Sequence, residues 1–166
     1  MPRKGSPPTW RHVITVMAQS LSNILLHLVF STKNREPFID ESIERDLFKY
    51  VATVSRTLHC PMHGIGAVDD HIHIACSLAR TVAVSQLVQE IKQDSSQWMK
   101  RQGPSYVDFA WQNGYGAFSI GQSQLGDLQR YIANQRAHHH RESFQDEFRR
   151  LLDRYGIAYD ERYLWD

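Results

Sequence analysis

One short run, Asp70-His71-Ile72-His73-Ile74, constrains the fold of this 166-residue chain more than any other. It follows a turn and lies within a β-like stretch. Successive side chains of a strand point to opposite faces, so both imidazoles share one face and both isoleucines share the other. The run therefore predicts a strand with an apolar face for a core and a second face that carries two histidines side by side.

Composition describes an ordinary globular chain, 42% hydrophobic and 22% charged, with enough residues for one sizeable core. No apolar stretch approaches the ~18 residues of a membrane span, and we expect no membrane contact. Cys60 and Cys76 show no paired spacing, which favours a reducing compartment and a cytoplasmic location. A net charge of +1 gives no general basic character, so binding to DNA would need local patches.

The sequence predicts two parts, a short N-terminal segment and one domain. Residues 1–16 contain three prolines among basic and polar neighbours and lack a secretory signal, so we expect a loose arm. Residues 17–166 are expected to form a single domain.

The periodicity along that domain alternates between strand and helix patterns. The expected strands are 23–31, 60–68, 71–78 and 115–120. The expected helices are 41–57, one from 84 that is ended by Gly103-Pro104, 123–136 and one over 144–155. The order predicts an α+β fold of the ferredoxin-like (RRM-like) type, with helices packed on one face of an antiparallel sheet and an added C-terminal helix that bears a tyrosine. The histidine face is expected opposite the core, where a ligand could reach it.

The two histidines form half of a possible divalent-metal site, because imidazole nitrogens two residues apart on a strand can converge on one ion. The alternative is that His71 and His73 are polar residues of a half-exposed strand. His27 shares the outward side of the first strand. We place it near the site without a defined role.

A second fragment lies sixty residues later, where Tyr131 and Gln135 are four apart and share one stripe of a predicted helix. Leu125, Leu128 and Ile132 mark the buried stripe of that helix. The tyrosine and the glutamine therefore lie on its shoulder, from which they can reach a site. The alternative is an ordinary boundary tyrosine beside a solvated glutamine.

Together the fragments suggest phosphoryl transfer. A divalent ion held by His71, His73 and the amide oxygen of Gln135 would keep positions open for phosphate oxygens. Tyr131 would attack the phosphorus and form phosphotyrosine, which conserves the bond for a later rejoining step. Such chemistry suits strand transfer better than hydrolysis.

This combination resembles the single-tyrosine HUH transposases of the IS-two-hundred-like group, including relatives associated with repetitive extragenic palindromes. Three further segments resemble the same family: 26–35, 91–98 and 111–116. The resemblance implies Mg²⁺ or Mn²⁺ on His71, His73 and Gln135, and a 5′-phosphotyrosine formed by Tyr131 on single-stranded DNA. It also implies recognition of hairpins at element ends and a homodimer, in which one subunit's tyrosine helix can complete the other's site. The chain departs from the family pattern at Asp70, which we expect to support the ligands without binding the ion.

Several cations are candidates for phosphate contacts, although lone surface cations usually only solvate. They are Lys33, Arg35, Lys92 and Arg136. The run 138–140 contains three histidines, which either neutralise phosphate, form a separate metal cluster or belong to a solvated turn.

The same residues are also compatible with two other functions. One is a non-catalytic, domesticated module that binds hairpins. The other is a metal-dependent phosphohydrolase with water as nucleophile, using His71, His73 and either His63 or His139. A covalent protein–DNA adduct distinguishes the transposase from both.

Overall fold

The computed structural model describes residues 20–139 and 141–165, so the arm expected over 1–16 lies outside the described residues. The strands are β1 (Leu25–Ser31), β2 (Met62–Val68), β3 (His71–Ser77) and β4 (Gly116–Ile120). The helices are α1 (Glu41–Thr57), α2 (Val84–Lys100), α3 (Leu125–Ala133), α4 (Gln135–His139) and α5 (Phe144–Arg154). Short 3₁₀ turns occupy Lys33–Arg35, Pro104–Tyr106 and Gln122–Gln124.

The four strands form one antiparallel sheet in the order β2-β3-β1-β4. This order, with α1 between β1 and β2 and α2 between β3 and β4, confirms the ferredoxin-like prediction. The start of α1 also agrees with expectation: Asp40 Oδ1 accepts the backbone N–H groups of Ser42 at 2.8 Å and Ile43 at 3.2 Å. An acidic side chain at this position satisfies the first free amides of the helix.

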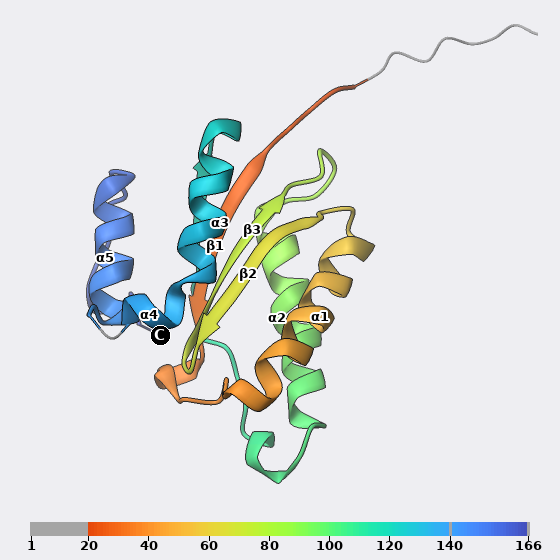
Figure 1. The fold of residues 1–166 in the computed structure, drawn as a ribbon, viewed down its shortest axis with the longest axis vertical. Helices are drawn as coiled ribbons and strands as arrows, with labels where there is room; N and C mark the ends of the chain where they lie inside the picture. Colours follow the sequence, from red (N-terminus) through yellow and green to blue (C-terminus); the bar gives the residue numbers. More distant parts are fainter. Residues whose placement is uncertain (1–19, 140, 166) are drawn as a thin grey trace, which may run out of the picture.

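The main core lies between α1, α2 and one face of the sheet (Figure 1). Ile72 and Ile74 of β3 are fully buried there beside Leu28 of β1, and Leu47 and Ile91 face them from the helices. The alternation read from the sequence therefore assigns the apolar face of β3 correctly.

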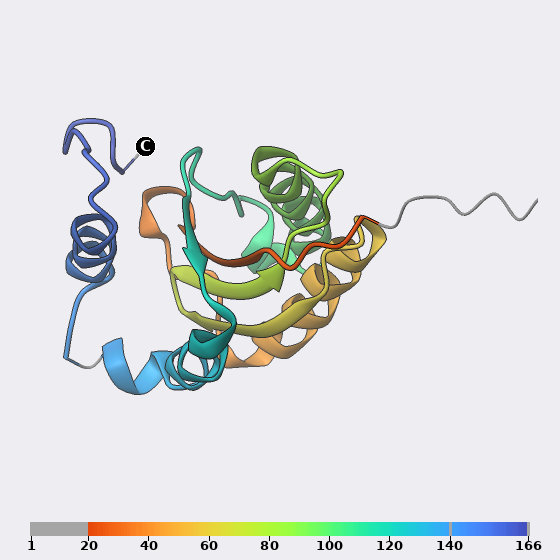
Figure 2. The ribbon, with the colours of Figure 1, turned by 90° about the horizontal axis from the view of Figure 1, so that it is seen from above.

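The opposite face carries the histidines, as predicted, but it is covered instead of open. Figure 2 shows α3 and α5 on the side of the sheet away from α1 and α2. His71 and His73 are each 0% exposed. The helix α3 lies so close to β2 that a Cβ added at Gly66 would be 2.4 Å from the carbonyl oxygen of Ile132. A ligand therefore reaches this face only around or between the covering helices.

A second, smaller core fastens α5 to β1 and β4. Phe144, Phe148 and Leu151 of α5 pack with Val29 and Phe118 of the sheet. The helix presents a narrow apolar stripe to the sheet and polar side chains to solvent, so its docking depends on these few contacts.

The predicted helix over 123–136 is wrong in its continuity. The helix α3 ends at Ala133, Asn134 leaves helical geometry at φ −101° and ψ 15°, and α4 starts at Gln135. Asn134 Nδ2 donates to the carbonyl oxygen of Arg130 at 2.9 Å, and the Asn134 backbone N–H donates to the same oxygen at 3.2 Å, so this residue caps the end of α3. Tyr131 and Gln135 therefore lie on two consecutive helices. Among the described residues, no helix is long and apolar enough to span a membrane.

Candidate metal and tyrosine site

The Nδ1 atoms of both histidines of β3 contact neighbouring side chains. His71 Nδ1 lies 2.6 Å from Asp70 Oδ1, and His73 Nδ1 lies 2.9 Å from His27 Nε2. These contacts occupy the outer ring nitrogens and turn both Nε2 atoms toward the interior. Both Nε2 atoms are buried and have no hydrogen-bond partner. Asp70 and His27, predicted as neighbours of the site, thus contact the two histidines directly.

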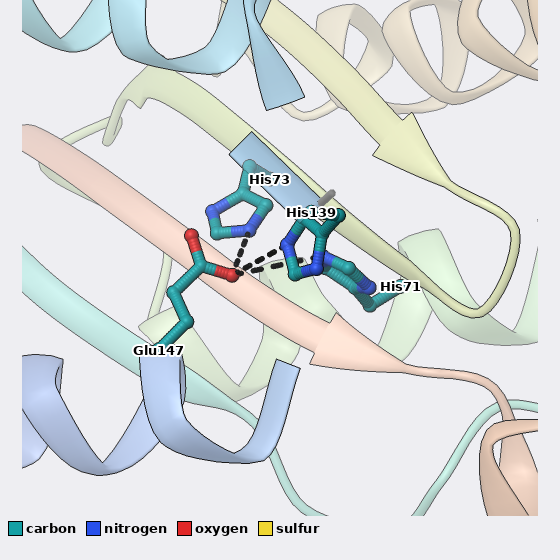
Figure 3. Close-up of side chains that lie close together, drawn as sticks. All are labelled: His71, His73, His139 and Glu147. Carbon is teal, nitrogen blue, oxygen red and sulfur yellow. Dashed lines mark hydrogen bonds and ion pairs between the residues drawn. The ribbon is translucent and has the colours of Figure 1, made fainter. Parts of the chain in front are cut away.

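Two further side chains join this pair from the covering helices. His139 of α4 and Glu147 of α5 bring their ligand atoms within 4.8 Å of those of His71 and His73 (Figure 3). Glu147 Oε2 lies 3.0 Å from Nε2 of His139, 3.4 Å from Nε2 of His73 and 3.7 Å from Nε2 of His71. Three imidazoles therefore surround one carboxylate oxygen in a buried cluster.

The other carboxylate oxygen faces the tyrosine. Tyr131 donates its hydroxyl hydrogen bond to Glu147 Oε1, and Gln135 Nε2 lies 3.3 Å from the same oxygen. The Gln135 Oε1 atom is buried without a hydrogen-bond partner. The Tyr131 ring centroid is 5.8 Å from that of His73. The phenol and the imidazole pair thus come together within one chain.

Burial and charge shift the ionisation of these groups. Burial alone would raise the pKa of the Glu147 carboxyl, but the hydrogen bond from His139 and the close contact with His73 outweigh it and hold this pKa well below its ordinary value. Burial, then the neighbouring Glu147 charge, raises the pKa of the Tyr131 phenol. Burial and the neighbouring His73 lower the pKa of His27 to about 3. The structure therefore holds an ionised carboxylate against a protonated phenol.

A hollow of about 720 Å³ opens beside Tyr131. His27 and Tyr131 line its inner end, and Arg150, Arg154 and Tyr155 line the side formed by α5 and its C-terminal end. Arg150 Nη2 lies 3.5 Å from the Tyr131 hydroxyl oxygen. The hollow thus leads from solvent to the phenol past two guanidinium groups.

The predicted phosphate contacts are scattered. The guanidinium of Arg136 already pairs with Glu44 and, at 3.0 Å, with Asp69. Lys33 and Arg35 lie in the exposed turn after β1. Arg35 also lines a second hollow, of about 610 Å³, that reaches His139.

Lys92 lies away from the histidine face, on α2. Its ammonium donates to the carbonyl oxygens of Gln112 at 2.8 Å and Gly114 at 2.6 Å, and it lies 4.9 Å from the ring centre of Phe30. These contacts give Lys92 a structural role in holding the loop before β4.

Sequence reasoning missed Glu147 altogether and left His139 among the alternatives. A signal for the glutamate exists. Phe144, Glu147, Phe148 and Leu151 occupy one face of α5 at helical spacing, and all four are buried. A carboxylate within an otherwise apolar stripe requires a buried partner, so the spacing of these four residues in the sequence itself indicates a buried site at Glu147. The structure describes neither residue 140 nor the side chain of residue 138 of the histidine run.

Comparisons with known proteins agree with this fold. Two solved structures resemble it: a candidate transposase from Deinococcus radiodurans and a REP-associated tyrosine transposase bound to a REP hairpin. The first is 16% identical, with a TM-score of 0.56 over 72% of this chain and 98% of the other. The second is 15% identical, with a TM-score of 0.55 over 74% of each chain. No curated protein sequence matches the chain significantly.

The family assignment comes from the sequence itself. Residues 20–135 match the family described as "Transposase IS200 like". This segment holds the whole sheet, α1 to α3, the paired histidines and Tyr131. The chain therefore belongs to the IS200-like transposase family.

Proposed function

We propose that this protein cleaves and rejoins single-stranded DNA at hairpin-containing element ends, through a 5′-phosphotyrosine on Tyr131. The observation that carries the proposal is the position of the Tyr131 hydroxyl, hydrogen-bonded to Glu147 beside the buried His71 and His73. A nucleophile, a proton acceptor and two candidate metal ligands are thus gathered around one point in a member of a transposase family.

The residues at this point fit a divalent ion, for which the family resemblance implies Mg²⁺ or Mn²⁺. Nε2 of His71, Nε2 of His73 and Oε1 of Gln135 are buried polar atoms without hydrogen-bond partners. Such atoms are costly unless a ligand satisfies them. When bound, the ion supplies charge that polarises the scissile phosphate and stabilises the departing oxygen.

The chain's own residues perform the transfer. Tyr131 Oη attacks phosphorus as the bond from phosphorus to the 3′ oxygen breaks. Glu147 Oε1, which already accepts the phenolic hydrogen bond, takes the proton and passes it to water, and the departing 3′ oxygen takes up one proton from water, so that no proton is gained or lost overall. Rejoining reverses these steps: a 3′ hydroxyl attacks the phosphotyrosine and the phenol is restored. The covalent link conserves the bond that a hydrolase would lose to water.

The hollow beside Tyr131 supports an entry route for the strand. Its volume lies within the range of ~300–1,000 Å³ that is usual for small-ligand pockets, enough for a nucleotide. Arg150 and Arg154 offer guanidinium groups to backbone phosphates along it. The neighbour that is bound to a REP hairpin supports DNA hairpins as the substrate class.

Two element ends have to meet before strands are exchanged, and we propose a homodimer for this purpose. Tyr131 approaches His73 of its own chain. This geometry favours a site that is complete within one subunit over one completed by the partner's tyrosine.

A 3′-labelled hairpin oligonucleotide, incubated with the protein and Mn²⁺ and run on a denaturing gel, tests the proposal. We expect a covalent adduct that Tyr131→Phe abolishes and Tyr163→Phe, an exposed control, retains. Binding that survives both EDTA and Tyr131→Phe, with no adduct, would indicate a domesticated binding module. Cleavage without any protein-linked product would indicate a phosphohydrolase.

A further inference from the structure

We propose that His139 and Glu147 complete the metal centre, which becomes a site of three imidazoles and one carboxylate selective for transition-metal ions over Mg²⁺. This inference rests on the proposed role of His71 and His73 as metal ligands and extends it to α4 and α5. Both added residues lie beyond the segment that matches the family, which ends at residue 135.

The distances within the cluster carry the inference. The carboxylate oxygen Glu147 Oε2 lies between 3.0 and 3.7 Å from the Nε2 atoms of the three histidines. Metal–nitrogen bonds of ~2.0–2.1 Å place neighbouring donor atoms about 3.0 Å apart around a six-coordinate ion and about 3.3 Å apart around a tetrahedral one. The three separations from Glu147 Oε2 span these values, and the ligand atoms of the four residues all lie within 4.8 Å of one another, so one ion can contact all four donors after the side chains adjust. Six-coordinate geometry leaves two positions for phosphate oxygens.

The orientation of the imidazoles is set from outside the cluster. Asp70 contacts Nδ1 of His71, and His27 contacts Nδ1 of His73, which leaves both Nε2 atoms for an ion. A carboxylate or another ring behind a ligating histidine is the usual arrangement in metal sites, because it fixes the tautomer and the ring direction. The inward Nε2 atoms of β3 are otherwise without hydrogen-bond partners.

The charge of Glu147 also needs a cation. The hydrogen bonds and ion pairs described for Glu147 come from His71, His73, His139, Tyr131 and Gln135, and none comes from a lysine or an arginine. A carboxylate 1% exposed and paired only with imidazoles and neutral groups is expensive to bury. A divalent ion at the centre of the imidazoles supplies the missing positive charge.

The chemical types of the ligand atoms determine which metal ion the site prefers. Imidazole suits zinc, copper, iron and nickel, whereas Mg²⁺ prefers carboxylate, carbonyl and water oxygens in octahedral geometry. Three nitrogens against one oxygen therefore favour transition-metal ions over Mg²⁺, with Mn²⁺ the weakest binder of the divalent first-row series. Because the ligands come from β3, α4 and α5, binding also ties α4 and α5 to the sheet.

Co²⁺ titration of the full, metal-stripped chain tests the inference through its visible absorption, which reports ligand number and geometry. We expect Glu147→Gln and His139→Ala to weaken Co²⁺ binding at least tenfold and to change the spectrum. The matched controls are Glu142→Gln, whose carboxylate pairs with Arg150, and His63→Ala, whose ring bonds Ser77 on β3. Mg²⁺ at the same concentration should leave the unfolding temperature unchanged, whereas Mn²⁺ and Co²⁺ should raise it.

Wild-type affinity and spectrum in both Glu147→Gln and His139→Ala, with binding lost in His71→Ala, would overturn the inference and leave the proposed function intact. Undiminished binding in His71→Ala would instead remove the metal from the proposed function. Pulsed EPR of the Cu²⁺-loaded wild-type chain needs no variant. Three coordinated imidazoles support the inference, and two overturn it.

Discussion

The Tyr131 hydroxyl donates its hydrogen bond to Glu147, and this contact joins two helices that the sequence alone does not bring together. Tyr131 lies at the end of α3, and Glu147 lies on α5 beyond the kink at Asn134 and the short helix α4. The same carboxylate faces His73 and His139 with its other oxygen. One side chain thus connects the candidate nucleophile to the candidate metal ligands, and the predictions below test the parts of this arrangement separately.

The close approach of α3 to β2 positions Tyr131, and Gly66 permits it. In Gly66→Ala the new Cβ would meet the Ile132 carbonyl oxygen, so α3 has to move outward from the sheet. We expect a loss of about 1–3 kcal/mol in the free energy of unfolding, typical of overpacking, and a large fall in adduct formation. Gly64→Ala is the matched control on the same strand, because its Cβ would lie 3.6 Å from Gln129 Cγ. Equal activity of the two variants would contradict the account.

The residue directly before the first histidine is predicted to act on metal affinity through His71. Asp70→Asn removes the charged partner of Nδ1 and weakens the hold on the ring. Changes of this kind typically cost 10–100-fold in metal affinity. Isothermal titration with Mn²⁺ measures the effect. Asp69→Asn, which affects the pair with Arg136 instead, should bind Mn²⁺ like the wild type; equal affinities in the two variants would refute a role for Asp70.

Arg150 is predicted to bind the phosphate next to the tyrosine. Its guanidinium lies 3.5 Å from the Tyr131 hydroxyl and pairs with Glu142 in the free protein. Arg150→Gln should weaken single-stranded DNA binding and reduce the slope of log affinity against log salt by about 0.7. Fluorescence anisotropy across a salt series checks this. Arg162→Gln, in the exposed C-terminal segment, serves as the control; an unchanged slope in Arg150→Gln would exclude the contact.

The surroundings of His71 and Tyr131 show which features of the site can be predicted from the sequence and which cannot. The alternation around His71 predicts the strand, its core face and its histidine face, because period-two patterning is local. The sequence-based prediction fails for features that depend on contacts between segments far apart in the chain. The covering of the histidine face by α5 depends on Phe148 packing beside Gly116, a contact that no periodicity encodes. The break at Asn134 leaves no mark in the periodicity, because Tyr131, Ile132 and Gln135 keep helical spacing across it. Glu147 lies too far along the chain from the histidines for spacing to join them.

Lys92 illustrates the same limit among the cations. The sequence names it as a candidate for DNA binding, which stays a prediction, and the structure adds that its ammonium donates to backbone carbonyls of the loop before β4. Lys92→Met should therefore lower the free energy of unfolding by about 1–3 kcal/mol, because hydrogen bonds from a charged donor to the loop are lost. Adduct formation at low temperature should be unchanged. Urea unfolding combined with the gel assay separates the two effects, and loss of the adduct without loss of stability would restore Lys92 as a DNA contact.

The most direct test of the central claim is the identity of the residue that carries DNA. Adduct formed on a hairpin oligonucleotide with Mn²⁺ can be digested with nuclease and trypsin and sequenced by tandem mass spectrometry. The account predicts a nucleotide linked through its 5′ phosphate to Tyr131, in the tryptic peptide of residues 131–136. A nucleotide on any other tyrosine, or cleaved DNA with no modified peptide, would contradict it.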